Sequence, residues 1–431
     1  FHFTPITFAR MSNATSNRPT WRSKVILATI SMVGCLVIAE LVLESLRPAA
    51  VNTERIKRSI RLREHRPASS SLRERPIAFL QNCDGPAKKQ AALRIDIEGF
   101  IEPSRVHLNA DLEIVFLGGS TTECMYVDEN IRFPYLAGRK LEASLSVTVN
   151  SYNAGNSGNH SMHSNHILLA KVLPRQPDMV VLMHCINDLK YLTYTGGYWS
   201  DYDDHLLQRA IVVTTRWNRE QVKSLAPWPG VKQFMSHTFP ELYQRALAIK
   251  QRTASTPDKR NKPDEWEQFR SRPLQYDLDA LSQQFARSLT LFCTTCRTYK
   301  IEPVLMTQAH RSTAPTSKML QQWKVATAGM NYDFEKFAQH YAHFNNVIRQ
   351  VAEKHKILLV DLEKTIPPKH EFMYDLVHFT NHGSRFVAQI VSDQLEHQLK
   401  KQHSLSKSPV SSHIPEYTFA EHSDAGDNDA E

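Results

Sequence analysis

The chain has 431 residues, of which 41% are hydrophobic and 22% are charged, a balance that is typical of globular proteins and excludes a wholly disordered chain. This length is sufficient for one large domain or two ordinary ones. The formal net charge is +8, but eight basic residues lie between residues 54 and 75, so the charge does not indicate nucleic acid binding by the main domain.

The first predicted element is an apolar helix near the N-terminus. Residues 25–39 carry no charge, and residues 41–43 extend the run past Glu40. At about 1.5 Å per residue this run reaches the length of a bilayer-spanning helix. We therefore expect residues 1–24 to be an N-terminal tail and residues 25–43 to be a transmembrane signal anchor.

Two alternatives to a retained anchor have less support. A cleaved signal peptide needs a small-x-small site, and Pro48-Ala49-Ala50 is a poor match. A lipoprotein cysteine at Cys35 is disfavoured because the apolar run continues well past it. Basic residues flank both ends of the helix in nearly equal number, so the positive-inside rule does not fix its orientation. A short N-terminal tail that stays in the cytoplasm would place the following domain outside, in the periplasm.

The rest of the chain divides by composition. Residues 44–90 are charged and weakly periodic, which predicts a basic linker, either solvated or lying on anionic lipid. A folded domain is expected over residues 91–401. It is interrupted at about 190–275 by an insertion rich in Trp, Tyr, Arg and Pro, which we interpret as a lid or substrate-shaping subdomain. Residues 402–431 are polar and acidic and predict a disordered tail.

Strand, loop and helix alternate at intervals of about thirty residues from residue 111 onward, which indicates βαβ units and a parallel sheet. The expected strands are short and apolar: residues 113–117, 147–152, 179–183, 303–306 and 357–360. The expected helices have the spacing of amphipathic helices: residues 133–143, 163–173, 278–299, 333–356 and 382–400. The fold class is therefore α/β.

Ser120 follows the first of these strands, directly after Gly118-Gly119. A serine on a tight turn after a strand can act as a nucleophile, or it can simply cap the helix that follows. Thr122 occupies the place of the second glycine of a G-x-S-x-G elbow, so the segment is not that of an α/β-hydrolase.

Asp375 and His378 stand three residues apart, just before the closing helix. A carboxylate at this spacing can hold an imidazole in the tautomer that accepts a proton from a serine. A surface pair is the alternative. The pair lies in the loop between the last predicted strand and the closing helix. The carboxyl ends of parallel strands meet in one crevice, so this position favours a catalytic role.

Two further polar segments follow the second and third strands. Gly158 lies in Asn153-Ala-Gly-Asn-Ser-Gly158, and Asn187 lies in Cys185-Ile-Asn187-Asp188. A glycine lets a backbone N–H approach an oxyanion closely, and an asparagine amide supplies another donor. Ordinary loop chemistry is the alternative for both, with a positive φ at the glycine and Asn-Asp as a helix cap.

Taken in order, these four segments resemble the four blocks of the SGNH/GDSL hydrolase superfamily, over residues 114–400 apart from most of the insertion. The resemblance implies a flavodoxin-like three-layer α/β/α sandwich. It also implies that Ser120 is the nucleophile, His378 the base and Asp375 its orienting partner, with Ser120, Gly158 and Asn187 forming the oxyanion hole. Gly119 replaces the usual acidic residue before the serine, and Cys185 replaces a glycine.

The function expected from these segments is ester hydrolysis. A serine esterase or acylhydrolase would cleave a carboxylic ester, such as an O-acetyl group on envelope carbohydrate, without a metal or organic cofactor. The alternatives are an O-acyltransferase with the same triad and a non-catalytic glycan-binding or assembly protein. The expected partners are the glycan ester and the membrane, reached through the N-terminal helix, and not nucleic acid.

Other reactive side chains carry weaker predictions. Cys124 and Cys185 would lie near the catalytic edge, either as a disulfide or, with slightly more support, as small buried residues. The Cys293-Thr-Thr-Cys296 motif lies in an apolar helix and predicts buried thiols. The histidines at 160, 163 and 166 lack partners at a recognised metal spacing and predict a polar helix start.

Overall fold

The computed structural model describes residues 21–45, 60–81, 88–199, 208–210, 242 and 273–406. The chain divides into two compact units, one of residues 1–57 and 210–264 and the other of residues 58–209 and 265–431. In the first unit, helix α1 (Trp21–Ser45) contains a stretch, Trp21–Val42, that is long and apolar enough to cross a membrane. The predicted apolar helix is therefore present as a candidate span, although a signal sequence passes the same test.

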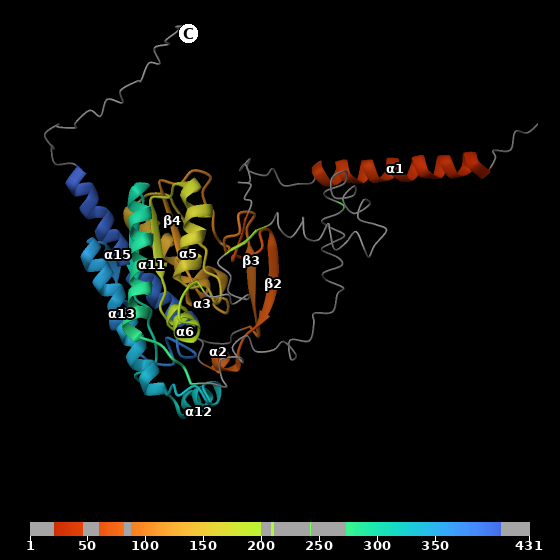
Figure 1. Ribbon diagram of the computed structural model, residues 1–431. Helices are drawn as coiled ribbons and strands as arrows, with labels where there is room; N and C mark the ends of the chain where they lie inside the picture. The colour runs from red at the N-terminus through yellow and green to blue at the C-terminus, as the bar shows by residue number, and fades with distance from the viewer. Residues whose placement is uncertain are drawn as a thin grey trace, which may run out of the picture. The chain divides into compact units, whose positions relative to one another are not determined.

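A five-stranded sheet forms the centre of the second unit (Figure 1). Its order is β5-β4-β6-β8-β9, and every neighbouring pair is parallel. The strands are β4 (Leu112–Gly118), β5 (Val149–Asn153), β6 (Met179–Met183), β8 (Glu302–Met306) and β9 (Leu358–Val360). In chain order this sequence of strands is 2-1-3-4-5, the flavodoxin-like arrangement. The predicted parallel sheet is confirmed.

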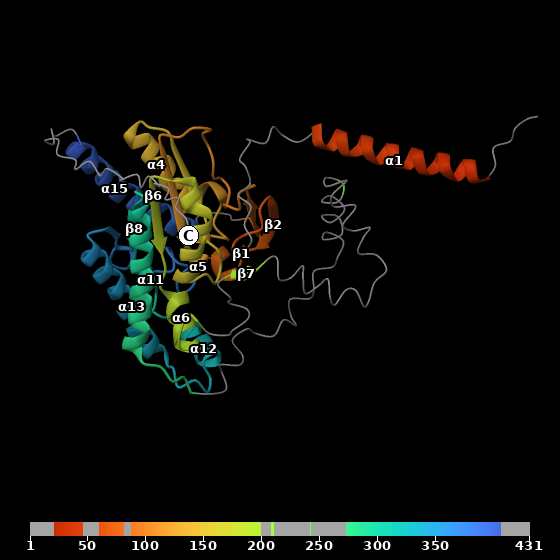
Figure 2. The same ribbon diagram turned by 45° about the horizontal axis from the view of Figure 1, so that its top comes forward.

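Helices cover both faces of this sheet. Successive side chains of a strand point to opposite faces, so Ile114 and Phe116 of β4 join one apolar cluster while Val115 and Leu117 join the other. The first cluster lies under α4 (Phe133–Leu145) and α15 (Asn381–Ser406). The second lies under α5 (Ser161–Ile167), α6 (Ile186–Thr195), α11 (Leu278–Thr298) and α13 (Phe334–His355). Helices α11 and α13 run side by side in both views (Figure 2). The three-layer α/β/α sandwich is confirmed.

Short elements complete the fold. They are α3 (Ser120–Glu123), the 3-10 helix Glu129–Ile131, the π-helical turn Leu168–Val172, the 3-10 turn Leu173–Arg175, β7 (Gln208–Ala210), α12 (Ser317–Ala326) and α14 (Leu362–Thr365). Strand β7 pairs with β1 (Ile60–Leu62) in a small separate sheet. The π-helical turn follows α5 directly, inside the range predicted as one continuous helix.

Part of the predicted linker at residues 44–90 is folded structure, which corrects that prediction. Strands β2 (Ser69–Glu74) and β3 (Gln90–Ile95) pair antiparallel, and helix α2 (Ile77–Gln81) lies between them. Two side chains connect this segment to the rest of the second unit. Phe79 is fully buried, and Arg75 forms an ion pair with Asp128 while its Nε donates to the carbonyl of Tyr126 at 2.8 Å. At least one of the charged side chains in this segment, Arg75, is therefore buried and paired.

The insertion and the tail fall largely outside the described residues. Helix α6 ends at Thr195 and α11 begins at Leu278, so most of the predicted insertion at 190–275 lies outside the described residues. Helix α15 continues to Ser406, past the predicted start of the tail at residue 402, since no glycine or proline interrupts it there. Residues 407–431 lie outside the described part of the chain.

Candidate active site

The predicted site residues come from loops at the carboxyl ends of the parallel strands. Ser120 follows β4 after one intervening residue, and the loop that contains Gly158 follows β5. Asn187 is the second residue of α6, directly after β6. His378 and Asp375 lie in the loop between α14 and α15. In open parallel sheets this edge forms the crevice in which ligands bind.

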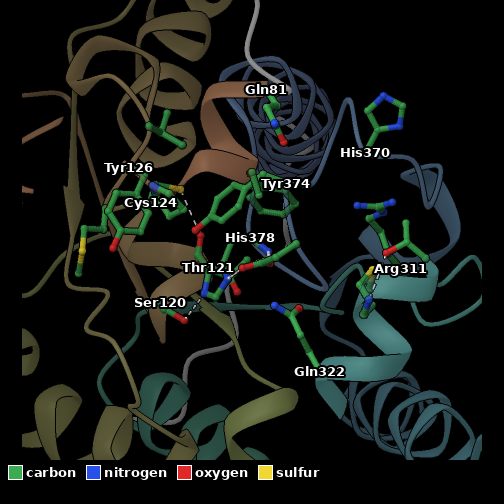
Figure 3. Close-up of a pocket in the computed structure, with 18 of the residues that line it drawn as sticks. Gln81, Ser120, Thr121, Cys124, Tyr126, Arg311, Gln322, His370, Tyr374 and His378 are labelled. Carbon is green, nitrogen blue, oxygen red and sulfur yellow. Dashed lines mark hydrogen bonds and ion pairs between the residues drawn. The ribbon is translucent and has the colours of Figure 1, made fainter. Parts of the chain in front are cut away.

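Ser120, His378 and Asp375 form a continuous chain of hydrogen bonds. Figure 3 shows Ser120 and His378 in the pocket. The Oγ of Ser120 lies 2.8 Å from Nε2 of His378, and Nδ1 of His378 lies 2.7 Å from Oδ2 of Asp375. The other carboxylate oxygen of Asp375 accepts the backbone N–H groups of Val377 at 3.0 Å and His378 at 2.8 Å. This is the order in which a serine, a base and an orienting carboxylate are arranged for nucleophilic attack.

Electrostatics within this chain favour a charged pair. Burial alone would lower the pKa of His378, but the attraction and hydrogen bond of Asp375 outweigh it, so the pKa of His378 is raised above its ordinary value. Burial would raise the pKa of Asp375, but His378 and two backbone N–H groups hold it below its ordinary value. The carboxylate therefore stays ionised and can stabilise an imidazolium that forms during reaction.

Gly119 provides the space in which Asn187 approaches the serine turn. A Cβ at position 119 would lie 2.5 Å from Nδ2 of Asn187 and 3.1 Å from the carbonyl oxygen of Asn159. The same Nδ2 donates to the Asn159 carbonyl at 2.8 Å. An acidic residue, which the resemblance would place at 119, cannot fit without moving this amide. The missing acidic residue is thus explained by close packing of the Asn187 side chain.

Gly158 occupies a turn that requires its conformation. Its φ is +77°, and the N–H of Asn159 donates to the carbonyl of Asn156 at 3.0 Å, closing a turn around it. A Cβ at 158 would also lie 2.7 Å from the guanidinium of Arg63. The loop alternative for this glycine is therefore supported. Its role as an oxyanion donor, like that of Asn187 and the Ser120 N–H, stays a prediction.

Two buried side chains hold the site loops together; the sequence analysis did not identify the first and named the second, Asp188, only as part of an Asn-Asp helix cap. Gln308, just after β8, donates from Nε2 to Thr121 Oγ1 at 2.6 Å and accepts the N–H of Ile186 at 2.9 Å. Asp188 accepts the N–H of Ser161 at 2.9 Å and the hydroxyl of Tyr198 at 2.5 Å. Burial raises the pKa of Asp188 to about 6. Both residues follow a predicted strand, and this position is the sequence feature that could have identified them as part of the site.

A third such residue is Glu123, in the turn that follows Ser120. Its side chain is fully buried, accepts a hydrogen bond from Ser157 and lies 3.3 Å from Nε2 of His65. Ser157 precedes Gly158, so Glu123 links the serine turn to the loop proposed to supply an oxyanion donor. Its spacing of three residues from Ser120 gave no sequence signal on its own.

The triad opens on a cavity of about 800 Å³. Its walls combine the aromatic rings of Tyr126 and Tyr374 with the side-chain amides of Gln81 and Gln322. Arg311, in the loop after β8, also lines it and was not identified from the sequence. The cavity is large enough for a sugar-sized ligand.

The cysteines and histidines correct or refine the earlier predictions. Cys124 and Cys185 are free thiols that belong to the apolar clusters on opposite faces of the sheet. The alternative of a disulfide is therefore wrong, and the prediction that both are small buried residues is confirmed. Cys293 and Cys296 are buried as predicted. His160 immediately precedes α5, at the predicted polar helix start. Within the described residues no group of three or more His, Cys, Asp or Glu side chains is placed to hold a metal ion.

Comparisons with known proteins give matches in structure alone. No family model matches the sequence, and no curated protein sequence matches it. Among solved structures, the chain is similar to an acetyl xylan esterase at 15% identity, with 65% of this chain and 98% of the other covered and a TM-score of 0.35. A putative GDSL-like lipase from Parabacteroides merdae matches at 12% identity, with 67% and 98% covered and a TM-score of 0.37.

A lipase/acylhydrolase from Enterococcus faecalis matches at 14% identity, with 67% of this chain and 96% of the other covered and a TM-score of 0.36. The central sheet has the flavodoxin-like strand order that the resemblance implied, and the loops that carry the four segments lie at its carboxyl edge. Because identities and TM-scores are low, the roles of individual residues rest on the geometry of this chain.

Proposed function

We propose that the chain is a serine esterase that cleaves a carboxylic ester with Ser120, His378 and Asp375. The observation that carries this proposal is the unbroken hydrogen-bond chain from Asp375 through His378 to Ser120, opening on a cavity of about 800 Å³. A surface pair or a helix cap would not need all three side chains to meet at the mouth of a cavity.

The proposed reaction has two halves. Ser120 Oγ attacks the ester carbonyl carbon while its proton passes to Nε2 of His378, which then protonates the departing alcohol. Water next gives a proton to His378 and attacks the acyl-enzyme, and the acid leaves as Ser120 regains its proton. The N–H of Ser120, the N–H of Gly158 and the amide of Asn187 are proposed to stabilise the oxyanion in both halves.

We propose an O-acyl group on carbohydrate as the substrate and the extracytoplasmic side of a membrane as the location. Aromatic rings and side-chain amides on the cavity wall suit a hydroxylated ligand. The apolar helix α1 supports attachment to a membrane. An acyltransferase would use the same side chains, with a sugar hydroxyl replacing water in the second half.

The test is hydrolysis of p-nitrophenyl acetate by the full chain in detergent, beside Ser120→Ala. We expect the variant to lose roughly 10³-fold or more in kcat, since it lacks the attacking atom. Ser144→Ala, an exposed serine on α4, is the matched control and should keep the wild-type rate. Equal rates in wild type and Ser120→Ala, with both folded, would favour the non-catalytic glycan-binding reading.

A further inference from the structure

The cavity beside Ser120 is lined by an excess of basic side chains. Arg311, Lys318 and His370 all line it. Among the described residues that line this cavity, Asp375 is the one carboxylate, and both of its oxygens already accept hydrogen bonds from His378 or the adjacent backbone. Arg311 and Lys318 outnumber this single carboxylate, so a ligand in the cavity meets an excess of positive charge.

Arg311 is held firmly beside the triad but uses little of its hydrogen-bonding capacity. The residue is 6% exposed, and its backbone N–H donates to the carbonyl of Leu376 at 2.8 Å. One guanidinium nitrogen, Nη1, donates to the carbonyl of Met373 at 3.1 Å, whereas the buried Nε has no hydrogen-bond partner. A guanidinium has five N–H donors in a planar fork, and these side-chain contacts use one of them.

A buried guanidinium with unmet donors is costly unless something compensates it. Burial lowers the pKa of Arg311, and attraction to Asp375 opposes that effect without a hydrogen bond between the two. An anionic ligand would supply a negative charge beside the Arg311 guanidinium and hydrogen-bond acceptors for its N–H groups. Carboxylates and phosphates match its geometry, because they accept two parallel N–H bonds.

The start of helix α12 adds to this positive wall. Thr316, Lys318 and Met319 line the cavity, and they belong to the cap and first turn of this ten-residue helix. The backbone dipoles of a helix place partial positive charge at its N-terminus. In the view of Figure 3, Arg311 and Gln322 lie on the side of the pocket away from Tyr126, with Ser120 and His378 between.

We infer that Arg311 and the first turn of α12 form an anion subsite, so that the preferred substrate is an ester on a molecule that also carries a carboxylate or phosphate. This inference rests on the proposed esterase function and names its substrate class. An acylated acidic sugar has the required chemistry, because its charge and its acyl group lie within one ring of each other. Arg311 would be a specificity-determining residue that contacts the anion.

The alternative role for Arg311 is to position Asp375. A positioning residue would lower the rate for every ester in the same proportion, whereas an anion subsite lowers it selectively for charged esters. The ratio of kcat/KM between charged and neutral substrates therefore separates the two roles.

The experiment uses the full chain in detergent and three fully O-acetylated methyl glucosides that differ at carbon 6. One carries a carboxylate, the second a phosphate ester and the third a carboxamide, and released acetate is measured. We expect kcat/KM for one of the two anions to exceed that for the carboxamide by roughly tenfold to a hundredfold, the size of a charge-assisted hydrogen-bond contribution. The preferred anion identifies the carboxylate or phosphate source.

Variants then show which side chains cause the preference for the anionic substrate. Arg311→Gln should reduce the ratio of anion to carboxamide to nearly one, while Arg311→Lys should keep part of it. Lys318→Gln should reduce the ratio modestly, and Lys324→Gln, which is exposed on the same helix but outside the cavity, is the matched control and should not change it. If Arg311→Gln fails to fold, competitive inhibition of the wild type by glucuronate against glucose replaces it.

The outcomes are separable from those of the proposed function. A wild-type ratio near one, or equal inhibition by glucuronate and glucose, overturns the subsite even when Ser120-dependent hydrolysis of p-nitrophenyl acetate is present. An equal loss for all three substrates in Arg311→Gln also overturns it and assigns positioning instead. Loss of Ser120 dependence with p-nitrophenyl acetate would instead remove the proposed function itself.

Discussion

At the scale of single residues, the catalytic proposal depends on the protonation state of His378. Ser120 can transfer its proton only to a neutral imidazole, so activity requires a pH above the pKa of His378. Asp375 raises that pKa above its ordinary value of 6.5, against the effect of burial. The pH dependence of the reaction therefore reports on a contact between two named side chains.

We expect kcat/KM for p-nitrophenyl acetate to rise with pH through a midpoint above 6.5 in the wild type. Asp375→Asn removes the attraction and leaves burial, which lowers the pKa of His378, so the midpoint should move to lower pH while kcat falls roughly 10³- to 10⁴-fold. The measurement is kcat/KM from pH 5 to 9 for both proteins. An unchanged midpoint in the variant would show that Asp375 does not act on His378.

The convergence of Ser120, Asp375 and His378 could be predicted because a short motif marks each of them. Arg311 could not be, since a lone arginine after a strand has no pattern, and its importance arises from a cavity built by distant segments. The reason for glycine at 119 also depends on a tertiary contact, with the amide of Asn187. Short motifs therefore identified the hydrogen-bonded chain of the candidate site better than the side chains that surround it.

At the scale of elements, the strands were well predicted and the short helices were not. Strand β6 matches its predicted range, and β4 and β8 match within one residue at each end, because continuous apolar runs mark strands buried on both faces. Helices α6 and α12 were missed. Helix α6 is ten residues of mixed polarity that lie directly after a strand, and α12 has no buried side chain in its ten residues, so neither gives a strong apolar periodicity.

The folded part of the predicted linker contacts the candidate site. The carbonyl of Arg63 accepts the side-chain amides of Asn156 at 3.2 Å and Asn159 at 3.1 Å, on either side of Gly158. His65 lies 3.3 Å from the buried carboxylate of Glu123. Residues 63–65 therefore support the loop that carries a proposed oxyanion donor, and fragments that begin near residue 90 would lack this support.

We expect His65→Ala to lower the free energy of unfolding by about 1–3 kcal/mol, because it removes the imidazole that lies 3.3 Å from the buried Glu123 carboxylate. Urea denaturation of the full chain in detergent measures this change. His397→Ala, an exposed histidine on α15, is the control and should stay within about 0.5 kcal/mol of the wild type. A loss as small as that of the control would mean that His65 does not support the site.

At the scale of the whole molecule, the order of motifs along the chain predicted both the fold and the place of the site. In a parallel sheet, segments that follow successive strands converge on one edge, and Ser120, Gly158 and Asn187 follow β4, β5 and β6 in that way. The folded segment at 60–81 was beyond prediction because its strands are short and have few apolar residues. Leu62 and Phe79 of this segment pack into the apolar clusters on the two faces of the main sheet.

The central claim is that Ser120 is the nucleophile, and covalent labelling tests it most directly. The full chain in detergent is treated with a fluorophosphonate, which reacts with activated serines, and the modified peptide is located by mass spectrometry. We predict one adduct, on Ser120, that forms at least 10²-fold more slowly in His378→Ala and is absent in Ser120→Ala. An adduct on another serine, or none on the folded wild type, would contradict the assignment.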